Sequence, residues 1–512
     1  MNKPKRRIFS FEPVTVFILL TLVTIIISGI GTLLNWQGTY ETINLANGAR
    51  ESVVVTVQNM FSISGIQYII SNSVTNFASF APLATLIIAF MGIGVIEKSG
   101  LFHTLFGKVK EAPVKMITFI IILLSILSSL FGDVGFVILM PIAALIFMLI
   151  GRNPVAGLIA SFAGITGGAG ANLIVSSIDM NLATFTGAAA ELIDQSYIVS
   201  ADSNWFFIIT ATLLLSIVGT FITEKWIVPR LGEYKAYDVI EDLEEKNVNT
   251  KKGLIYAGIS ALAFLLLIGY LVTPFLPGGG ILLNMEETGY INQLLGYNTY
   301  FSQGIPFIFA LLLLIPGLFY GIGSGTIRSD KDFFRATNSA MKDISKILIL
   351  MFFVAQFIAV FKKTEIGTLI NVALVNMIEA SQFQGIALIL LVFFVAMIGN
   401  LFITSTVTKW MMFAPVVVPL AMLSNITPEY MQAVFRAGDS ITNGITPLLA
   451  YFVVFIALVS KYNSLAKKPV TYMKAIRMIY PYALSFGIVW LILLLAWYII
   501  GLPIGPNIYP LI

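Results

Sequence analysis

Long apolar runs separated by short polar stretches make up most of this 512-residue chain. A helix needs about 20 apolar residues to cross a bilayer. Runs near or above that length predict nine transmembrane helices, at residues 14–34, 79–97, 155–178, 205–226, 253–274, 305–323, 343–361, 430–460 and 481–500. The first run is too long for the apolar region of a signal peptide, so we expect it to be retained as a helix.

Two further apolar stretches are each broken at a polar point. Residues 116–150 are interrupted near Gly132 and Asp133, and residues 384–424 are interrupted between Asn400 and Trp410. Each half is short for a complete span. Irregular backbone is tolerated at membrane depth only where protein or water covers it. The pattern therefore predicts two re-entrant helical hairpins, and the fold class is an all-α polytopic membrane protein.

Basic residues gather in alternate polar stretches, as expected of cytoplasmic loops. The stretches 1–13, 98–115, 151–154, 225–252, 324–346 and 461–480 fall on one side of the predicted topology and hold 25 of the 30 lysine and arginine residues. This asymmetry predicts a multi-pass protein of the bacterial cytoplasmic membrane, in contact with its lipid, with the N-terminus in the cytoplasm.

The two hairpins begin on opposite sides of the membrane in this topology, which predicts an inverted repeat. The first half is residues 1–229, with a broken helix at about 155–178, and the second is residues 253–512, with a broken helix at about 430–460. A charged stretch, residues 230–252, reads as a cytoplasmic linker. Pro141, Pro154 and Gly164 recur 274 residues later as Pro415, Pro428 and Gly438, although chance matches of these residues are common. Transporters with such repeats place their sites at the repeat interface.

Composition excludes several function classes. Only 11% of residues are charged and 58% are hydrophobic, whereas soluble proteins carry roughly a quarter charged residues. The absence of cysteine and the presence of one histidine exclude thiolate and histidine metal sites, and no phosphate-binding P-loop sequence occurs. The net charge of +4 reflects topology rather than a nucleic-acid partner. No cofactor is expected beyond a coupling Na⁺ or H⁺.

Charged residues at membrane depth are costly and usually functional. Arg436 and Asp439 lie three positions apart in AVFRAGDSITNGITP, so on a helix they share a face and form a candidate pair. In a functional interpretation, Arg436 binds a carboxylate, and Asp439 binds the coupling cation or proton. Asn443 follows as an additional oxygen ligand. The alternative is a structural ion pair that holds helices together.

The second hairpin break adds polar groups and an aromatic ring, at Asn400, Thr404, Ser405, Thr406, Thr408, Lys409 and Trp410. Amide and hydroxyl groups suit a hard cation or a carboxylate. Trp410 is a candidate for stacking on an aromatic substrate, and the alternative is a packing or interfacial role.

The first half contains the glycine-rich sequence FAGITGGAGANLIVSSID, which permits a broken helix whose free N–H groups face an anion. Close helix packing is the alternative. Asn172, Ser176, Ser177 and Asp179 follow the glycines. Asp133 at the first hairpin break is a further candidate, with helix capping as the alternative.

The segments KWMMFAPVVVP and FRAGDSITNGITP, together with GITGGAGANLIVSSID, resemble the aminobenzoyl-glutamate transporter (AbgT) family, and the resemblance covers nearly the whole chain. It implies a homodimer with nine spanning helices and two re-entrant hairpins. It also implies transport of p-aminobenzoyl-glutamate with a cation gradient, or export of sulfonamide antimetabolites. Family positions that line the route match Asp179, Asn400, Trp410, Pro428, Arg436, Asp439 and Pro447.

We therefore expect a cation-coupled secondary transporter, a symporter or antiporter, for a small anionic aromatic substrate. Asn400, Trp410, Arg436, Pro428 and Pro447 are the predicted substrate-binding residues, and Asp439, Asp179 and Asn443 the predicted coupling residues. The alternatives are a dicarboxylate or anion symporter of the same broad fold, a channel, and an intramembrane enzyme, for which the paired catalytic groups in signature motifs are missing.

Overall fold

The computed structural model describes residues 11–232, 234, 248–287, 289–296, 299–341, 344–462 and 470–512. The predicted linker therefore lies largely outside the described residues. The helices of the first half are α1 Pro13–Leu33, α2 Ile63–Ala78, α3 Ala81–Lys98, α4 Leu101–Phe106, α5 Val114–Leu127, α6 Val134–Leu149, α7 Pro154–Gly167, α8 Ser177–Ala190, α9 Trp205–Ile222 and α10 Val228–Leu231. Short 3₁₀ or π turns lie at Gly107–Glu111, Ser128–Phe131 and Thr223–Ile227.

The helices of the second half are α11 Thr250–Leu271, α12 Tyr290–Leu295, α13 Tyr300–Ser324, α14 Asp330–Met341, α15 Ile344–Lys363, α16 Ile366–Ser381, α17 Gly385–Gly399, α18 Thr406–Leu423, α19 Pro428–Thr442, α20 Phe452–Tyr462 and α21 Tyr472–Ile500. Among the described residues, eight helices are long and apolar enough to cross a membrane, or nine if one bent pair counts as a span. The predicted class of a largely helical polytopic membrane protein is confirmed.

Part of the chain expected to be loop is ordered. Residues 37–56 form an antiparallel hairpin of β1 Gln37–Ile43 and β2 Arg50–Thr56, and α2 follows directly. A second expected loop, after residue 361, is the helix α16, which is bent by 51° from α15. The two strands depart from the all-α prediction, because seven-residue strands carry no strong hydropathy signal. Helices α2 and α16 lie outside the predicted spans.

Two of the predicted spans are interrupted. The run at 155–178 is the helix α7 up to Gly167, followed by irregular backbone and then α8. The run at 430–460 is α19, then irregular backbone from Asn443 to Tyr451, then α20. Glycine is costly in a helix interior and proline more so. Gly167 and Gly168 in the first run, and Gly444 and Pro447 in the second, account for the breaks.

The two predicted hairpins are helix–break–helix segments. Helices α5 and α6 are separated by a 3₁₀ turn and by Gly132, whose φ is +62°. Helices α17 and α18 are separated by Asn400–Ser405. By length and composition alone, the segments Val114–Phe131 and Thr406–Leu423 are long and apolar enough to span, so the first and the last of these four helices exceed the half-span lengths we expected.

The five helices α5 to α9 and the five helices α17 to α21 are spaced along the chain in the same way. A shift of 274 residues carries Pro154, the first residue of α7, onto Pro428, the first residue of α19. The same shift carries Val134, the first residue of α6, to position 408, two residues inside α18. The spacing found among prolines and glycines in the sequence therefore extends to whole helices.

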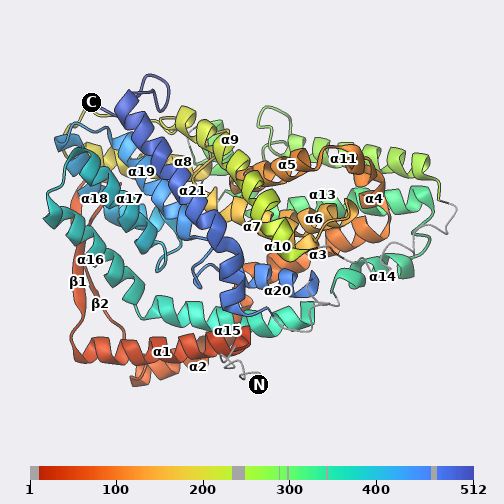
Figure 1. Ribbon diagram of the computed structural model, residues 1–512, viewed down its shortest axis with the longest axis horizontal. Helices are drawn as coiled ribbons and strands as arrows, with labels where there is room; N and C mark the ends of the chain where they lie inside the picture. Colours follow the sequence, from red (N-terminus) through yellow and green to blue (C-terminus); the bar gives the residue numbers. More distant parts are fainter. Residues whose placement is uncertain are drawn as a thin grey trace, which may run out of the picture.

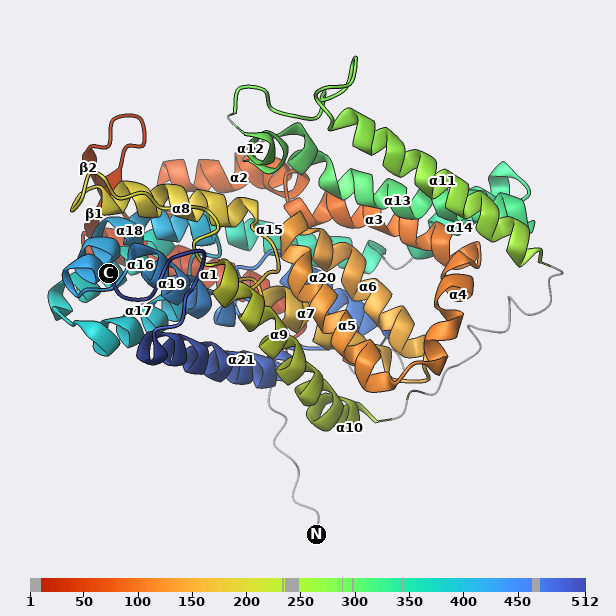
Figure 2. The ribbon, with the colours of Figure 1, turned by 90° about the horizontal axis from the view of Figure 1, so that it is seen from above.

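The helix that follows each break packs against the other half. In Figure 2, α8 lies beside α18 and α19, while α20 lies beside α6 and α7. Helix α21 crosses between the two groups and contacts both α9 and α19 (Figure 1). Helices α3, α11, α13 and α14 form a separate layer, and α1, α2 and α15 another. Two crossings of broken helices therefore form the interior, α7 with α20 and α19 with α8.

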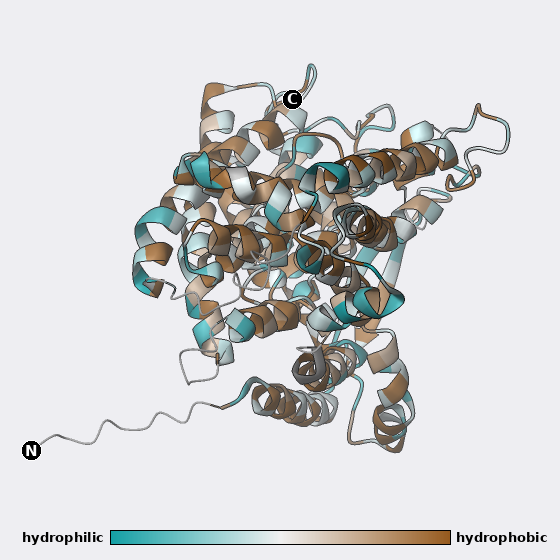
Figure 3. Ribbon diagram, turned by 90° about the vertical axis from the view of Figure 1, so that its right-hand side faces the viewer, coloured by the Kyte–Doolittle hydropathy of each residue, from teal (hydrophilic) through white to brown (hydrophobic). Residues whose placement is uncertain are grey.

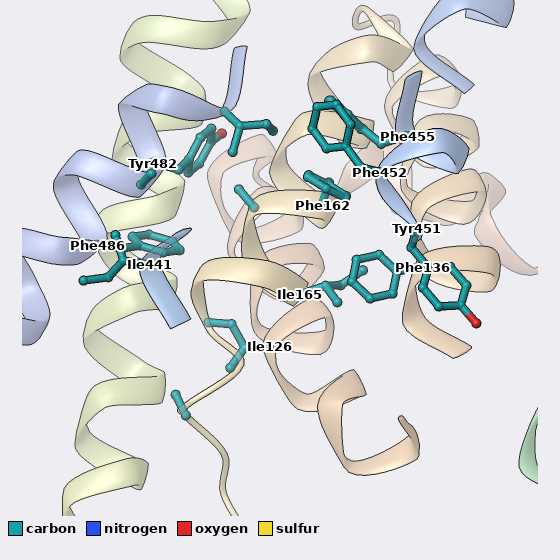
Figure 4. Close-up of a cluster of buried hydrophobic side chains, with 14 of the residues drawn as sticks. Ile126, Phe136, Phe162, Ile165, Ile441, Tyr451, Phe452, Phe455, Tyr482 and Phe486 are labelled. Carbon is teal, nitrogen blue, oxygen red and sulfur yellow. The ribbon is translucent and has the colours of Figure 1, made fainter. Parts of the chain in front are cut away.

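The crossing of α7 with α20 is filled by aromatic side chains. Phe162 of α7 stacks on Phe455 of α20, with ring centroids 4.4 Å apart. Phe136 of α6 stacks on Tyr451 at 4.9 Å, and Figure 4 shows these rings in one apolar cluster. Packed aromatic pairs contribute about 0.5–1.5 kcal/mol beyond the area they bury, so this crossing is held by dispersion and apolar burial.

The outer layer exposes apolar residues. Ile259, Leu262 and Leu266 of α11 are all more than half exposed, and Figure 3 shows hydrophobic residues along the sides of most helices. A soluble protein rarely exposes such continuous apolar surface. These faces are suited to lipid contact.

Glycine permits the closest approach in the interior. A Cβ on Gly438 of α19 would lie 2.2 Å from the backbone oxygen of Phe393 in α17. We expect Gly438→Ala to push these helices apart and to destabilise the protein by about 1–3 kcal/mol, a typical cost of overpacking. Thermal unfolding of the purified protein measures the change.

Gly258→Ala is the matched control, because nothing lies within 4 Å of the Cβ it would add to α11. Replacing an exposed glycine in a helix interior stabilises by about 0.5–1 kcal/mol. Equal midpoints for the two variants would contradict the close approach of α17 and α19.

Candidate functional site

Helix α19 presents a stripe of polar side chains to its neighbours. Gln432, Arg436, Asp439 and Asn443 lie four, three and four residues apart, which places them on one face, and all are buried. Each reaches a different partner: Gln432 and Arg436 contact α8, Asp439 contacts α18, and Asn443 contacts Asn400 at the hairpin break. The face of α19 is therefore the centre of the candidate site.

Arg436 pairs with Asp179 of α8, which joins the two halves of the chain. The guanidinium donates to the Asp179 carboxylate, and both side chains are nearly inaccessible. Asp179 is held by a capping box at the start of α8, where its Oδ2 accepts from the Ser176 backbone N–H at 2.7 Å and hydroxyl at 2.6 Å. The helix start thus fixes one carboxylate against the arginine.

Lys409 of α18 pairs with Asp439 of α19. Its ammonium also donates to Asn400 Oδ1 at 2.5 Å, and the Thr406 hydroxyl donates to Asp439 Oδ2 at 2.6 Å. Asn400 donates in turn to Thr442 Oγ1 and Asn443 Oδ1, both at 3.0 Å. The hairpin break is therefore tied to α19 through a continuous polar network.

We call Asp179, Asn400, Lys409, Arg436 and Asp439 the charged cluster. Its two cations balance its two anions. Breaking one buried ion pair by removing a partner typically costs about 3–5 kcal/mol, since the other charge is stranded. The Nε of Arg436 has no hydrogen-bond partner within the described residues. The arginine thus retains donor capacity that an additional acceptor can use.

Trp410 follows Lys409 in the chain, but its side chain contacts Thr186 and Phe435 rather than the charged cluster. The indole is fully buried, donates to Thr186 Oγ1 at 2.9 Å and packs against Phe435 with ring centroids 4.8 Å apart. Thr186 donates onward to Gln432. In this conformation Trp410 acts as a packing residue between α8, α18 and α19.

Several predicted site residues come together, with different partners from those expected. The pairing of Arg436 with Asp439 is corrected, because Asp179 and Lys409 supply their ion partners. Asn443 joins the network through Asn400. Pro428 starts α19, eight residues and about 12 Å from Arg436, and Pro447 lies in the irregular segment after α19, so neither is part of the charged cluster.

The first-half candidates other than Asp179 lie outside the charged cluster. Asn172 donates to Ser129 at 3.1 Å and accepts from the Leu173 N–H. Asp133 is exposed and takes the N-cap position of α6 without a capping hydrogen bond from its side chain, which weakens the capping alternative. At Gly170 a Cβ would lie 2.7 Å from Ser440 Oγ, so the glycine-rich break lies directly against α19.

Sequence reasoning missed partners that only the fold brings close. The sequence places Lys409 at membrane depth, where a lysine requires an acidic partner, but it does not indicate which acid that partner is. Gln432 could have been found from its position four residues before Arg436, which places it on the same face of a helix. Thr186, by contrast, has no sequence signal, because it comes from α8, some 240 residues away in the chain.

A cavity of about 300 Å³ lies beside the hairpin break. Thr404, Ser405 and Thr408 line it, together with Lys362 and Glu365 from the bend between α15 and α16. Thr408 adjoins Lys409 in the sequence. The cavity thus adjoins the residues that connect Asn400 to Lys409.

The corresponding crossing, of α7 with α20, is apolar. A shift of 274 residues matches Arg436 with Phe162 and Asp179 with Val453, and both of those are fully buried. One crossing of broken helices therefore carries ion pairs and the other carries stacked rings. This difference places the buried charges at α8, α18 and α19.

Comparisons with known proteins agree along the whole chain. A family model described as the AbgT putative transporter family matches residues 10–512. The p-aminobenzoyl-glutamate transport protein of Escherichia coli (strain K12) is 31% identical over 469 residues, 91% of this chain and 89% of that protein.

Solved structures also match, among them the following two. The YdaH transporter of Alcanivorax borkumensis has 31% identity and a TM-score of 0.48, covering 97% of this chain and 100% of that chain. MtrF of Neisseria gonorrhoeae, described with a class of antimetabolite efflux pumps, has 33% identity and a TM-score of 0.48, covering 98% of each chain.

Removal of one member of the Arg436–Asp179 pair is expected to be worse than removal of both. We expect Arg436→Met to destabilise by about 3–5 kcal/mol, because Asp179 is left buried and unpaired. Combining it with Asp179→Leu is expected to recover most of that loss. Thermal unfolding of the two single variants and the double variant measures the coupling, and strictly additive losses would contradict the pairing.

Proposed function

The chain belongs to the AbgT family of transporters, and on that premise we propose that it moves p-aminobenzoyl-glutamate or related aromatic carboxylates across the membrane by cation-coupled secondary transport. Family relatives are transporters rather than enzymes. One relative is described as a p-aminobenzoyl-glutamate transport protein, and another with antimetabolite efflux pumps. Export of sulfonamide-type antimetabolites is accordingly part of the proposal.

The observation that carries this proposal is the arginine held by a carboxylate from the other half. Arginine matches carboxylate geometry with two parallel N–H donors. Asp179 now occupies that position on Arg436. A substrate carboxylate has the same chemistry, so we propose that it takes the place of Asp179 on the guanidinium.

This exchange supplies a reason for coupling. When the substrate takes Arg436, Asp179 loses its cation while buried, which is unfavourable by several kcal/mol. A proton or cation that binds Asp179 removes that penalty. Substrate binding is then favoured by the presence of the coupling ion, which is the requirement for a symporter. In an antiporter, the substrate and the coupling ion compete for binding instead.

We propose that the aromatic ring of the substrate meets Trp410. The indole is enclosed by Phe435 of α19 and Thr186 of α8 in this conformation, so contact requires displacement of α8. Asn400, Asp439 and Asn443 are proposed to hold the hairpin in register with α19 during that movement. Pro428 and Pro447 would act at the ends of the moving segment rather than on the substrate.

The wider organisation is also proposed. Residues 1–229 and 253–512 are two inverted copies of one unit, with re-entrant hairpins at about 116–150 and 384–424, and the common 274-residue spacing of their helices supports this. We propose a homodimer in the bacterial cytoplasmic membrane with the N-terminus in the cytoplasm, from the family resemblance and the distribution of basic residues.

Uptake into proteoliposomes tests the substrate and the coupling. We expect labelled p-aminobenzoyl-glutamate to accumulate when a sodium or a proton gradient is imposed and not when neither is present. Failure of accumulation under every gradient, with folded protein, would reject this substrate. Competition by a dicarboxylate that lacks the ring, at equal strength, would favour the dicarboxylate alternative.

Asp179→Asn tests the exchange. Neutral asparagine leaves Arg436 free, so we expect the anionic substrate to bind at least as tightly as in the wild type while gradient-driven accumulation falls to the level of passive exchange. Glu429→Gln is the matched control, since Glu429 is a buried acid on α19 that accepts from Tyr197 at 2.9 Å. Coupled accumulation that survives Asp179→Asn would rule out this role of Asp179.

Trp410→Ala tests the ring contact. We expect a loss of transport of aromatic substrates of about fivefold or more, from stacking worth about 1 kcal/mol or above. Trp410→Phe keeps one aromatic ring and loses the second ring and the hydrogen bond to Thr186, so a smaller loss is expected. Wild-type rates from Trp410→Ala would remove stacking from the proposal.

A further inference from the structure

Lys409 occupies a position built for a small cation. Its ammonium contacts Asp439 Oδ1, and the side chain is fully buried, so water does not compete for this contact. Asn400 Oδ1 is 2.5 Å away, and the Thr406 hydroxyl lies on the other oxygen of the same carboxylate. The two oxygens at the ammonium are thus a carboxylate oxygen and an amide carbonyl oxygen, which are ligands that hard metal cations take in proteins.

The amide of Asn400 is oriented so that its oxygen faces this point. Its nitrogen donates to Thr442 Oγ1 and Asn443 Oδ1, and Thr442 is itself fixed by donation to the Met397 carbonyl at 2.8 Å. The nitrogen of an amide only donates and the oxygen only accepts. The network therefore directs an acceptor, rather than a donor, at the ammonium.

A second cation has no charge to neutralise here. Asp439 supplies a single negative charge, which Lys409 already balances. The other carboxylate of the charged cluster, Asp179, is paired with Arg436. Two like charges within a few ångströms in a buried environment repel strongly. A lysine ammonium is also a compact point charge on a flexible stem, so it resembles a bound monovalent cation in size and charge.

We propose that Lys409 is a tethered cation that fills a sodium-type site at Asp439 and excludes free Na⁺ from it. The inference deepens the proposed function, on which its meaning for coupling rests: Asp439 is neutralised from within the chain, and Asp179 is left as the carboxylate that takes the coupling ion. Lys409 is thus a residue that determines ion specificity, and removal of its charge converts the cluster into a Na⁺ site.

The contrasting explanation is a latch. In that case Lys409 only fastens the hairpin α17–α18 to α19, and any substitution that breaks the ion pair weakens the fold in the same way in every salt. A tethered cation, in contrast, is replaceable by a free one. The two explanations differ in whether Na⁺ restores stability to a variant that lacks the lysine.

The experiment compares thermal unfolding midpoints of purified full-length protein in sodium chloride and in choline chloride at equal ionic strength and mildly alkaline pH. The variants are Lys409→Met, which removes the charged terminal atom of the side chain and keeps most of its apolar length, and Lys409→Met with Asp439→Asn, which removes both charges. Purification in sodium chloride keeps the single variant folded if the site is filled by Na⁺. Lys409→Gln is a second single variant that retains polar contacts.

We expect Na⁺ to raise the midpoint of Lys409→Met by several degrees more than that of the wild type, in a saturable manner, because a ligand that binds only the folded state stabilises it. The double variant is expected to return to the wild-type response. The same pattern is expected for Lys409→Gln.

Equal sodium responses in the wild type and in both single variants would overturn the proposal and favour the latch. So would a gain in response that persists in the double variant, since the ion would then bind elsewhere. No substrate takes part in these measurements. Rejection of p-aminobenzoyl-glutamate as the substrate therefore leaves their outcome unchanged, and the failure of either idea can be told from the failure of the other.

Discussion

The pairing of buried charges along one face of α19 is the constraint on which the interior depends. Arg436 and Asp439 are too costly to bury alone, so Asp179 and Lys409 must lie within contact distance of them. Those contacts fix the start of α8 and the first turn of α18 against α19. The close approach of the backbone at Gly170 to α19 is consistent with this constraint, because a longer separation of α8 from α19 would leave Arg436 and Asp179 unpaired.

The two crossings of broken helices use opposite chemistry on similar geometry. At the first, Phe162 and Phe455 stack in a dry aromatic cluster. At the second, the position matching Phe162 is Arg436. Stacked rings cannot exchange their contact for an ionic one. An arginine, in contrast, can exchange one carboxylate for another with little net change in free energy. The first crossing is therefore suited to be a fixed pivot and the second to change its partners.

In the proposed transport cycle, an exchangeable ion pair also connects binding to movement. Asp179 is fixed by the capping box of α8, and Arg436 is carried by α19, so loss of their contact releases the two halves from each other at this point. Trp410 lies behind that contact, enclosed by Phe435 and linked to Thr186 of the same helix α8. Displacement of α8 would thus expose the indole at the moment when the arginine becomes free. The polar network from Lys409 to Asn443 keeps the hairpin break attached to α19 throughout.

The sequence by itself determined the membrane class, the approximate position of most spans, the two broken stretches and the charged residues that matter. Hydropathy, charge asymmetry and the positions of glycine and proline are local properties, and they are present in the chain before it folds. The partners of those charges were decided by the tertiary structure. An i, i+3 spacing allowed Arg436 to pair with Asp439, yet Asp179 and Lys409 approach more closely from other helices. The same holds for Trp410, whose exposed or buried state depends on α8 and α19 rather than on its own neighbours in the chain. A buried charge selects its partner by distance in space, and only the packing of the helices sets that distance.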